Sequence, residues 1–210
     1  MRFSIIALTV CMLCSISWRA TMAAPSLTIQ PVVITAQAIA EEPLLSSSAS
    51  FNVVASIEAG DELIAVAMRL SLASGEFYNH SLGTDTLPFP SLISLFPALA
   101  YDTHVHSGIG VQTPIIEGFT GIGSGSVGIG NSFDARWRPI SPIPGPGSFN
   151  MGRITIPNAS IGVVAETSIF TTAHPTGISA LIPVVPEPTA PAAFLAAGAA
   201  GLAARRQAMR

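Results

Sequence analysis

The sequence predicts an all-β protein whose central residues form a single antiparallel β-sandwich or jelly roll. Large apolar side chains alternate with small or polar ones over Leu63–Leu72 and again over Phe133–Arg138, which is the two-residue period of a strand with one buried face. No central segment carries a sustained apolar stripe at helical spacing, and loops rich in proline and glycine separate the alternating runs. Several short strands joined by such loops are typical of antiparallel sandwiches.

The first half of the central region predicts a lead-in segment followed by a hairpin. Residues 25–50 predict a lead-in with an edge strand near its start and a serine-rich turn near its end. Phe51–Ile57 and Leu63–Leu72 predict two strands that pair around a turn at residues 59–62. Gly75–His80 predicts a further short strand.

The second half predicts further strands separated by long loops. Three prolines over residues 84–99 indicate a loop with one helical turn at Ser91–Leu95. Gly152 indicates a β-bulge, because the apolar phase shifts there. The other predicted segments are a strand over residues 101–106, a glycine-rich connection over 121–130, a Pro/Gly loop over 139–147, and strands over 148–156 and 161–170.

Residues 1–24 have the layout of a secretory signal peptide, expected to form a helix that directs the chain to the Sec export machinery. Arg2 provides the basic start, an apolar stretch runs from Phe3 to about Ile16, and Thr21–Ala23 provides the small residues of a cleavage site. A retained N-terminal anchor is the alternative, although the apolar stretch is shorter than a membrane span needs.

The cysteine and charge content of the sequence excludes some classes of site and partner. Cys11 and Cys14 are the only cysteines in the sequence and lie inside the signal peptide, which excludes a disulfide framework or a thiolate metal site in the rest of the chain. Residues 25–185 carry four arginines against eleven aspartates and glutamates, and therefore a net charge of −7, with no lysine. Such a surface repels phosphate backbones, so the sequence predicts no nucleic-acid partner.

The most specific candidate site in the sequence is a metal site formed by Asp102, His104 and His106. Residues two apart on a strand share one face at a spacing of about 7 Å, so a carboxylate and two imidazoles can converge on zinc or a similar ion. The alternative is a polar, solvent-facing strand surface, because the sequence assigns no further ligand. Apart from this site, the sequence predicts no cofactor.

The sequence also offers candidate residues for catalysis and for sugar binding. The glycine-rich stretch contains no nucleophile elbow before a helix, and no spacing fixes a catalytic pair among Glu76, Glu117 and Glu166. The sequence therefore predicts no catalytic residue and no enzyme. Aromatic side chains can line a sugar-binding face, the alternative being that they belong to the core. The candidates for that face are Trp137, Tyr101, Tyr78 and the phenylalanines.

The end of the sequence combines a Pro-Glu-Pro motif, a short apolar run and a pair of arginines. The stretch VPEPTAPAAFLAAGAAGLAARR contains Pro186-Glu187-Pro188, an apolar run over residues 190–204, and Arg205-Arg206. The seventeen residues 188–204 would form a helix about 25 Å long, slightly short of a bilayer core of about 30 Å. The arginines favour a cytoplasmic tail end, which leaves the acidic domain outside.

These three parts, in this order, resemble the PEP-CTERM sorting domain. The resemblance covers residues 183–210 and implies recognition by an exosortase, transient insertion of the C-terminal helix in the inner membrane of a Gram-negative bacterium, and transfer to the cell surface or extracellular matrix. An ordinary permanent C-terminal anchor is the alternative.

The middle of the chain, residues 51–182, resembles cohesin-like or carbohydrate-binding-module-like sandwiches at the level of pattern. The segments that carry the resemblance are the hairpin, FPALAYDTHV, and FDARW with GSFNMGRITI. Together the two resemblances imply a non-enzymatic structural or adhesive component of an exopolysaccharide or biofilm matrix. A module that binds carbohydrate or protein is the main alternative, and a secreted hydrolase is the third.

Overall fold

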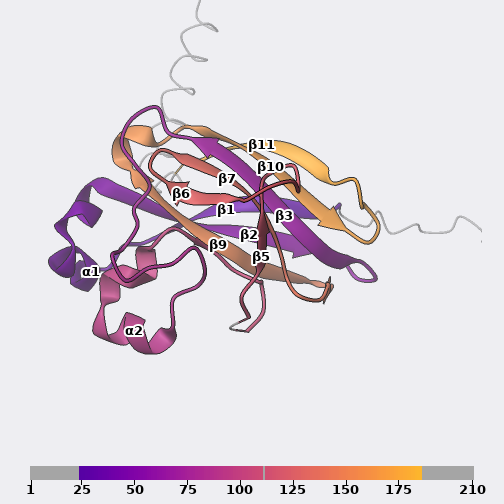
Figure 1. Cartoon of the computed structure of the whole chain (residues 1–210), viewed down its shortest axis with the longest axis horizontal. Coiled ribbons are helices and arrows are strands. Elements are labelled where there is room, and N and C mark those ends of the chain that lie inside the picture. Colours follow the sequence, from indigo (N-terminus) through magenta and orange to yellow (C-terminus); the bar gives the residue numbers. More distant parts are fainter. Residues whose placement is uncertain (1–23, 111, 186–210) are drawn as a thin grey trace, which may run out of the picture.

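Two antiparallel β-sheets form the body of the protein (Figure 1). The structure is a computed structural model that describes residues 24–110 and 112–185. Within these residues it contains eleven strands, two short α-helices and three 3-10 helices. The predicted all-β class is therefore confirmed at the level of predominantly β structure in antiparallel sheets.

The first sheet has four strands in the order β1-β2-β9-β4. The strands are β1 (Ser26–Val32), β2 (Ser48–Ile57), β9 (Gly147–Pro157) and β4 (His104–Val105). β1 pairs with β2 along its whole length and lies at the sheet edge, as predicted for the lead-in segment.

The second sheet has seven strands and a central path β11-β10-β3-β7-β5. β6 also pairs with β7, and β8 pairs with β3. The strands are β3 (Glu62–Ser71), β5 (Ile115–Glu117), β6 (Ser126–Ile129), β7 (Ser132–Arg138), β8 (Ile143–Pro144), β10 (Val164–Thr171) and β11 (Ile178–Pro183).

Both sheets contribute to one hydrophobic core. Phe51 of β2 and Ile154 of β9 come from the four-stranded sheet, whereas Phe133 and Trp137 come from β7 of the other. The Trp137 indole N–H donates a hydrogen bond of 2.6 Å to the carbonyl oxygen of Met151 in β9, which links the two sheets. The alternation predicted for β7 is confirmed, because Phe133, Ala135 and Trp137 are buried between half-buried polar neighbours.

The predicted hairpin between Phe51–Ile57 and Leu63–Leu72 is wrong, although both segments form strands. β2 pairs with β1 and β9, and β3 pairs with β7, β8 and β10, so the chain passes from one sheet to the other between them. Asp61 stabilises this corner, because its Oδ1 accepts hydrogen bonds from the Thr172 hydroxyl and the Ala173 amide at 2.7 and 2.9 Å. Each strand carries one buried face, and that face is equally well covered when the strands lie in opposite sheets.

The structure confirms one of the smaller predictions and corrects others. The bulge near Gly152 is confirmed, since the register of β2 against β9 shifts between Val53 and Val54, leaving Met151 as the extra residue. No strand forms over residues 75–80. β6 and β8 lie in segments predicted as loops, and β11 lies in a segment for which the sequence predicted no element.

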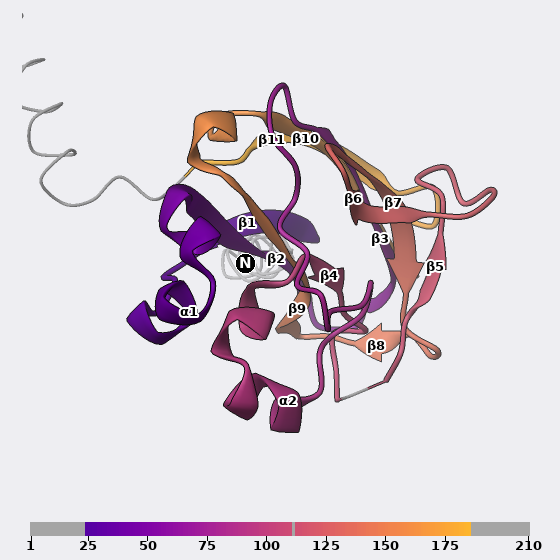
Figure 2. The same ribbon diagram turned by 60° about the vertical axis from the view of Figure 1, so that its left-hand side comes forward.

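Short helices form a second, smaller layer beside the four-stranded sheet (Figure 2). The helices of this layer are α1 (Ala36–Glu41), η1 (Pro43–Ser47), α2 (Pro90–Leu95) and η2 (Pro97–Tyr101), whereas η3 (Asn158–Ser160) follows β9 and lies apart from them. α2 confirms the predicted helical turn. Ala38, Leu45, Ala98 and Tyr101 form a separate apolar cluster between these segments. Arg153 of β9 fastens this cluster to the sheet by donating to the Ala100 carbonyl oxygen and to Asn52 Oδ1.

In the ranges 24–110 and 112–185, no helix has the length and apolar character needed to cross a membrane. The predicted signal helix and C-terminal helix fall outside these ranges.

Candidate functional site

The segment predicted as a metal-binding strand is mostly not a strand. η2 ends at Tyr101, and the strand β4 covers only His104 and Val105. The Asp102 amide donates to the Leu99 carbonyl oxygen and the Thr103 amide donates to that of Tyr78. These bonds to local turns and to the neighbouring loop replace the continuous ladder that a strand over residues 101–106 would need.

The three predicted ligands are therefore each engaged separately. Asp102 Oδ1 accepts a hydrogen bond of 2.7 Å from the His80 amide. His104 Nδ1 donates to the Asp102 carbonyl oxygen at 2.8 Å, and His106 Nε2 lies 2.9 Å from the Gly110 carbonyl oxygen. No group of three histidine, cysteine, aspartate or glutamate side chains in the described part of the chain is placed to hold a metal ion. The predicted site at Asp102, His104 and His106 is thus not formed.

Asp102 and His104 instead form a buried structural pair. Asp102 is 1% exposed and His104 is 3% exposed. Burial raises the pKa of Asp102 from 3.8 to about 7 despite the hydrogen bond from His80, and burial lowers the pKa of His104 from 6.5 to about 3. Both groups are therefore held toward their neutral forms.

The loop over residues 80–84 closes tightly around the Asp102 carboxyl. A Cβ atom at Gly83 would overlap the Asp102 carboxylate oxygens, so glycine is required for this close approach. A cavity of about 120 Å³ lies beside this contact, and its lining includes Asn79, Thr84 and Asp85. The Asp102 carboxyl, which directly follows η2, holds this loop through its hydrogen bond from the His80 amide, a structural role that the spacing to His104 did not reveal.

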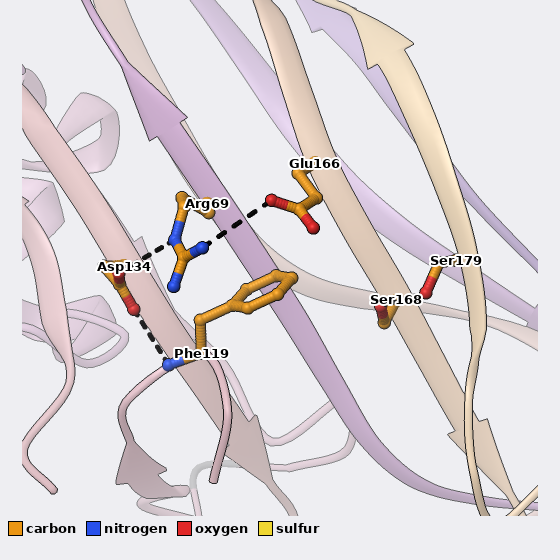
Figure 3. A network of polar contacts seen from close by, with 6 residues as sticks. All are labelled: Arg69, Phe119, Asp134, Glu166, Ser168 and Ser179. Carbon is orange, nitrogen blue, oxygen red and sulfur yellow. Dashed lines mark hydrogen bonds and ion pairs between the residues drawn. The ribbon is translucent and has the colours of Figure 1, made fainter. Parts of the chain in front are cut away.

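The outward face of the seven-stranded sheet carries a network of paired charges, shown in Figure 3. Arg69 of β3 lies between Asp134 of β7, at 3.0 Å, and Glu166 of β10, at 3.8 Å. Asp134 Oδ1 also accepts a hydrogen bond of 2.8 Å from the Phe119 amide, and the Arg69 guanidinium lies 4.6 Å from the centre of the Phe119 ring. The side chains of Arg69, Asp134 and Glu166 are 38–49% exposed, so each ion pair contributes little to stability.

A second arginine covers a second aromatic ring on the same face. The Arg136 guanidinium lies 4.2 Å from the centre of the Phe170 ring. Ala67 of β3 pairs with Arg136 in register and is completely buried. This small residue leaves room for the arginine to lie across β3 toward Phe170 on β10. Phe119 and Phe170 are therefore partners of arginines, a role that alternation along single strands does not indicate.

Most of the aromatic side chains proposed for a sugar-binding face are not available for it. Trp137 is completely buried and Tyr101 is 5% exposed. The Tyr101 hydroxyl donates to the Val33 carbonyl oxygen and accepts from the Thr35 amide. Tyr78 is half-buried against the helical cluster. Assigning Trp137 and Tyr101 to a sugar-binding face is therefore wrong, and the alternative that they belong to the cores is confirmed.

Phe89 is the most exposed aromatic side chain in the described part of the chain, at 68%, and Phe96 follows at 36%. It lines a groove of about 190 Å³ at the start of α2, between Pro88 and Pro90. The groove has apolar walls with hydroxyl and amide groups among them, and none of its lining residues is charged. The other lining residues are Leu82, Thr84, Thr86, Leu87, Leu92, Gln112 and Thr113.

The candidate glutamates for glycoside hydrolysis have other neighbours. Glu117 lies 3.9 Å from Arg138, and Glu166 belongs to the Arg69 network. Glu76 is exposed on a loop. Glu117 and Glu166 therefore each face an arginine.

The residues of the predicted sorting signal, Pro186, Glu187 and Pro188 with Arg205 and Arg206, lie outside the residues that the structure describes. Their function stays a prediction from the sequence. Comparison with known proteins adds no assignment: no family model, no curated protein and no solved structure matches this chain.

Proposed function

We propose that this protein is exported, sorted by an exosortase through its C-terminal signal, and retained at the cell surface or in the extracellular matrix. There its β domain would act as a structural or adhesive component associated with exopolysaccharide. The observation that carries the proposal is the order of Pro186-Glu187-Pro188, the apolar run and Arg205-Arg206 at the end of the chain.

The β domain supports a structural role through the contacts of its polar groups. The two sheets with their shared core suit a single antiparallel β-sandwich of the jelly-roll or cohesin-like type. The conspicuous titratable groups are occupied by structural contacts: Asp102 and His104 hold loops, and Glu117 and Glu166 face arginines. Such contacts stabilise a scaffold, and each of these four groups already has a partner within the domain.

The sorting proposal predicts that Glu187→Ala blocks removal of the tail. The substitution removes the acidic residue of the motif, so the chain is expected to stay at the inner membrane at the larger, uncleaved mass. Immunoblots of membrane, surface and culture-medium fractions measure this. Glu76→Ala is the matched control, because it removes an exposed carboxylate from the β domain. Cleavage and localisation of the Glu187→Ala chain identical to those of the unmodified chain would contradict sorting through the Pro-Glu-Pro motif, whereas an unmodified chain whose tail is never removed would show that the tail is an ordinary anchor.

A module that binds carbohydrate is the second candidate, and the Phe89 groove is the observation that favours it. An exposed ring offers a flat apolar platform for a sugar ring, and the hydroxyls of Thr86 and Thr113 and the amide of Gln112 can hydrogen-bond to sugar hydroxyls. A secreted hydrolase is the third and least supported candidate, since no nucleophile or acid pair is assigned.

Binding at this groove predicts that Phe89→Ala weakens retention of the full chain on exopolysaccharide by about tenfold, because the apolar contact area of one ring is lost. A glycan array followed by affinity electrophoresis measures the effect. Leu95→Ala serves as the control, since Leu95 is 71% exposed on α2 and does not line the groove. Equal retention of the two variants, or no binding by the unmodified chain, removes this candidate.

A further inference from the structure

The edges of the two sheets differ in their capacity to accept another strand. β4 and β5, at one edge of each sheet, contain two and three residues. β1 is longer but contains Pro31, which lacks a backbone donor and is typical of a protected edge. β11 contains six residues, with its only proline at the last position, Pro183.

The middle of β11 is open on both faces. Ser179, Ala180 and Leu181 are all exposed, and Leu181 is 73% exposed. β11 pairs with β10 on one side, and no described strand pairs with its other side, although β1 approaches it. Figure 1 shows β11 as the outermost strand of its sheet. Its outer backbone amides and carbonyls are therefore available to a further strand.

β11 also lacks the charged residues that protect an edge. The segment Thr172–Val185 contains no lysine, arginine, aspartate or glutamate, whereas residues 25–185 as a whole carry a net charge of −7. Two copies of this acidic domain repel one another over most of their surface, and β11 is a place where they can meet without opposed like charges.

The position of β11 in the chain favours a second copy as the occupant. β11 ends at Pro183, and the predicted membrane segment begins only a few residues later, at about residue 190. Copies that are inserted in one membrane through the same tail hold this strand at the same height and at high effective concentration.

We infer that β11 is a self-association edge, at which two copies of this chain join their seven-stranded sheets through β11–β11 pairing. The step that brings the copies together rests on the membrane-inserted tail of the proposed function. The pairing is a symmetric contact in which one surface binds itself, as in most protein dimers.

Cysteine crosslinking in the full chain tests this inference directly. With Cys11 and Cys14 replaced by alanine, the chain contains no other cysteine, so single cysteines can be placed at Ser179, Ala180 or Leu181. Oxidation in membranes is expected to give a covalent dimer from at least one of the three. Ile122→Cys is the control and should stay monomeric, because Ile122 is 81% exposed on a loop away from β11.

A charge placed on the edge provides a second, independent readout. In mild detergent, light scattering is expected to show a dimer for the unmodified chain, a monomer for Leu181→Lys and a dimer for Ile122→Lys. Monomers throughout, no crosslink at residues 179–181, or a crosslink to a different protein would each overturn self-pairing. Repeating the crosslinking with Glu187→Ala separates the two proposals. If the crosslinks persist and the tail is cleaved as in the unmodified chain, the sorting proposal is contradicted and the self-association proposal is not.

Discussion

Replacing Trp137 by alanine is expected to lower the free energy of unfolding by about 3–5 kcal/mol, the largest effect of any single substitution considered. Trp137 is completely buried in the shared core and contacts Phe133, with ring centres 5.9 Å apart. Its removal leaves a cavity between the sheets and deprives the Met151 carbonyl oxygen of its donor. Both losses fall on the contact that links β7 to β9.

Urea denaturation followed by far-ultraviolet circular dichroism measures this effect. Trp137→Phe is expected to fall between the alanine variant and the unmodified protein, because it retains most of the apolar volume and loses only the N–H donor. Ile122→Ala, at an exposed loop position, should change stability by less than about 0.5 kcal/mol. A loss below about 1 kcal/mol for Trp137→Ala would mean that the two sheets do not share this core.

Asp102→Asn is expected to stabilise the protein increasingly as the pH rises from 4 to 8. The pKa of Asp102 is about 7 in the folded protein against an ordinary value of 3.8. The folded state therefore binds this proton more tightly, and the contribution of Asp102 to stability falls as the pH rises through this window. An asparagine stays neutral throughout, so the variant should match the unmodified protein near pH 4 and exceed it by about 2–4 kcal/mol near pH 8.

His104 produces the opposite trend in the unmodified protein. Its pKa is about 3 in the folded protein against 6.5 ordinarily, so stability rises with pH between these values as the unfolded chain loses its proton. The two trends nearly cancel between pH 4 and 6.5, and Asp102→Asn should reveal the rise due to His104.

Urea titrations at pH 4, 6 and 8 measure the difference between Asp102→Asn and the unmodified protein. Glu76→Gln is the control, since this carboxylate is exposed on a loop. A stability difference for Asp102→Asn that stays constant across the three pH values would show that Asp102 is not held in its neutral form.

The positions of the strands followed from the sequence to a large extent. Alternation identified β3 and β7 and the buried faces of Phe133 and Trp137, and the change of phase identified the bulge near Gly152. The sequence did not predict β11. Ile178, Ala180 and Ile182 alternate with Ser179 and Leu181, so the two faces of this strand differ little in polarity.

The candidate sites were less predictable. The spacing of Asp102, His104 and His106 predicted a shared strand face, but their environments depend on hydrogen bonds to His80, Gly110 and the turn at Leu99. The arginines over Phe119 and Phe170 depend in the same way on strands that are distant in sequence. Spacing along one strand carries no information about such partners.

The sequence alone determined the β class and the acidic composition of residues 25–185 without cysteine or lysine, and it is the source of the predicted signals at both ends, because each of these depends on local composition and period. Only the tertiary structure decided that β2 and β3 lie in different sheets, that Asp102 and His104 are buried, and that β11 forms an open edge. A two-residue period records which face of a strand is buried, whereas strand pairing and burial of a polar group arise from contacts between distant segments.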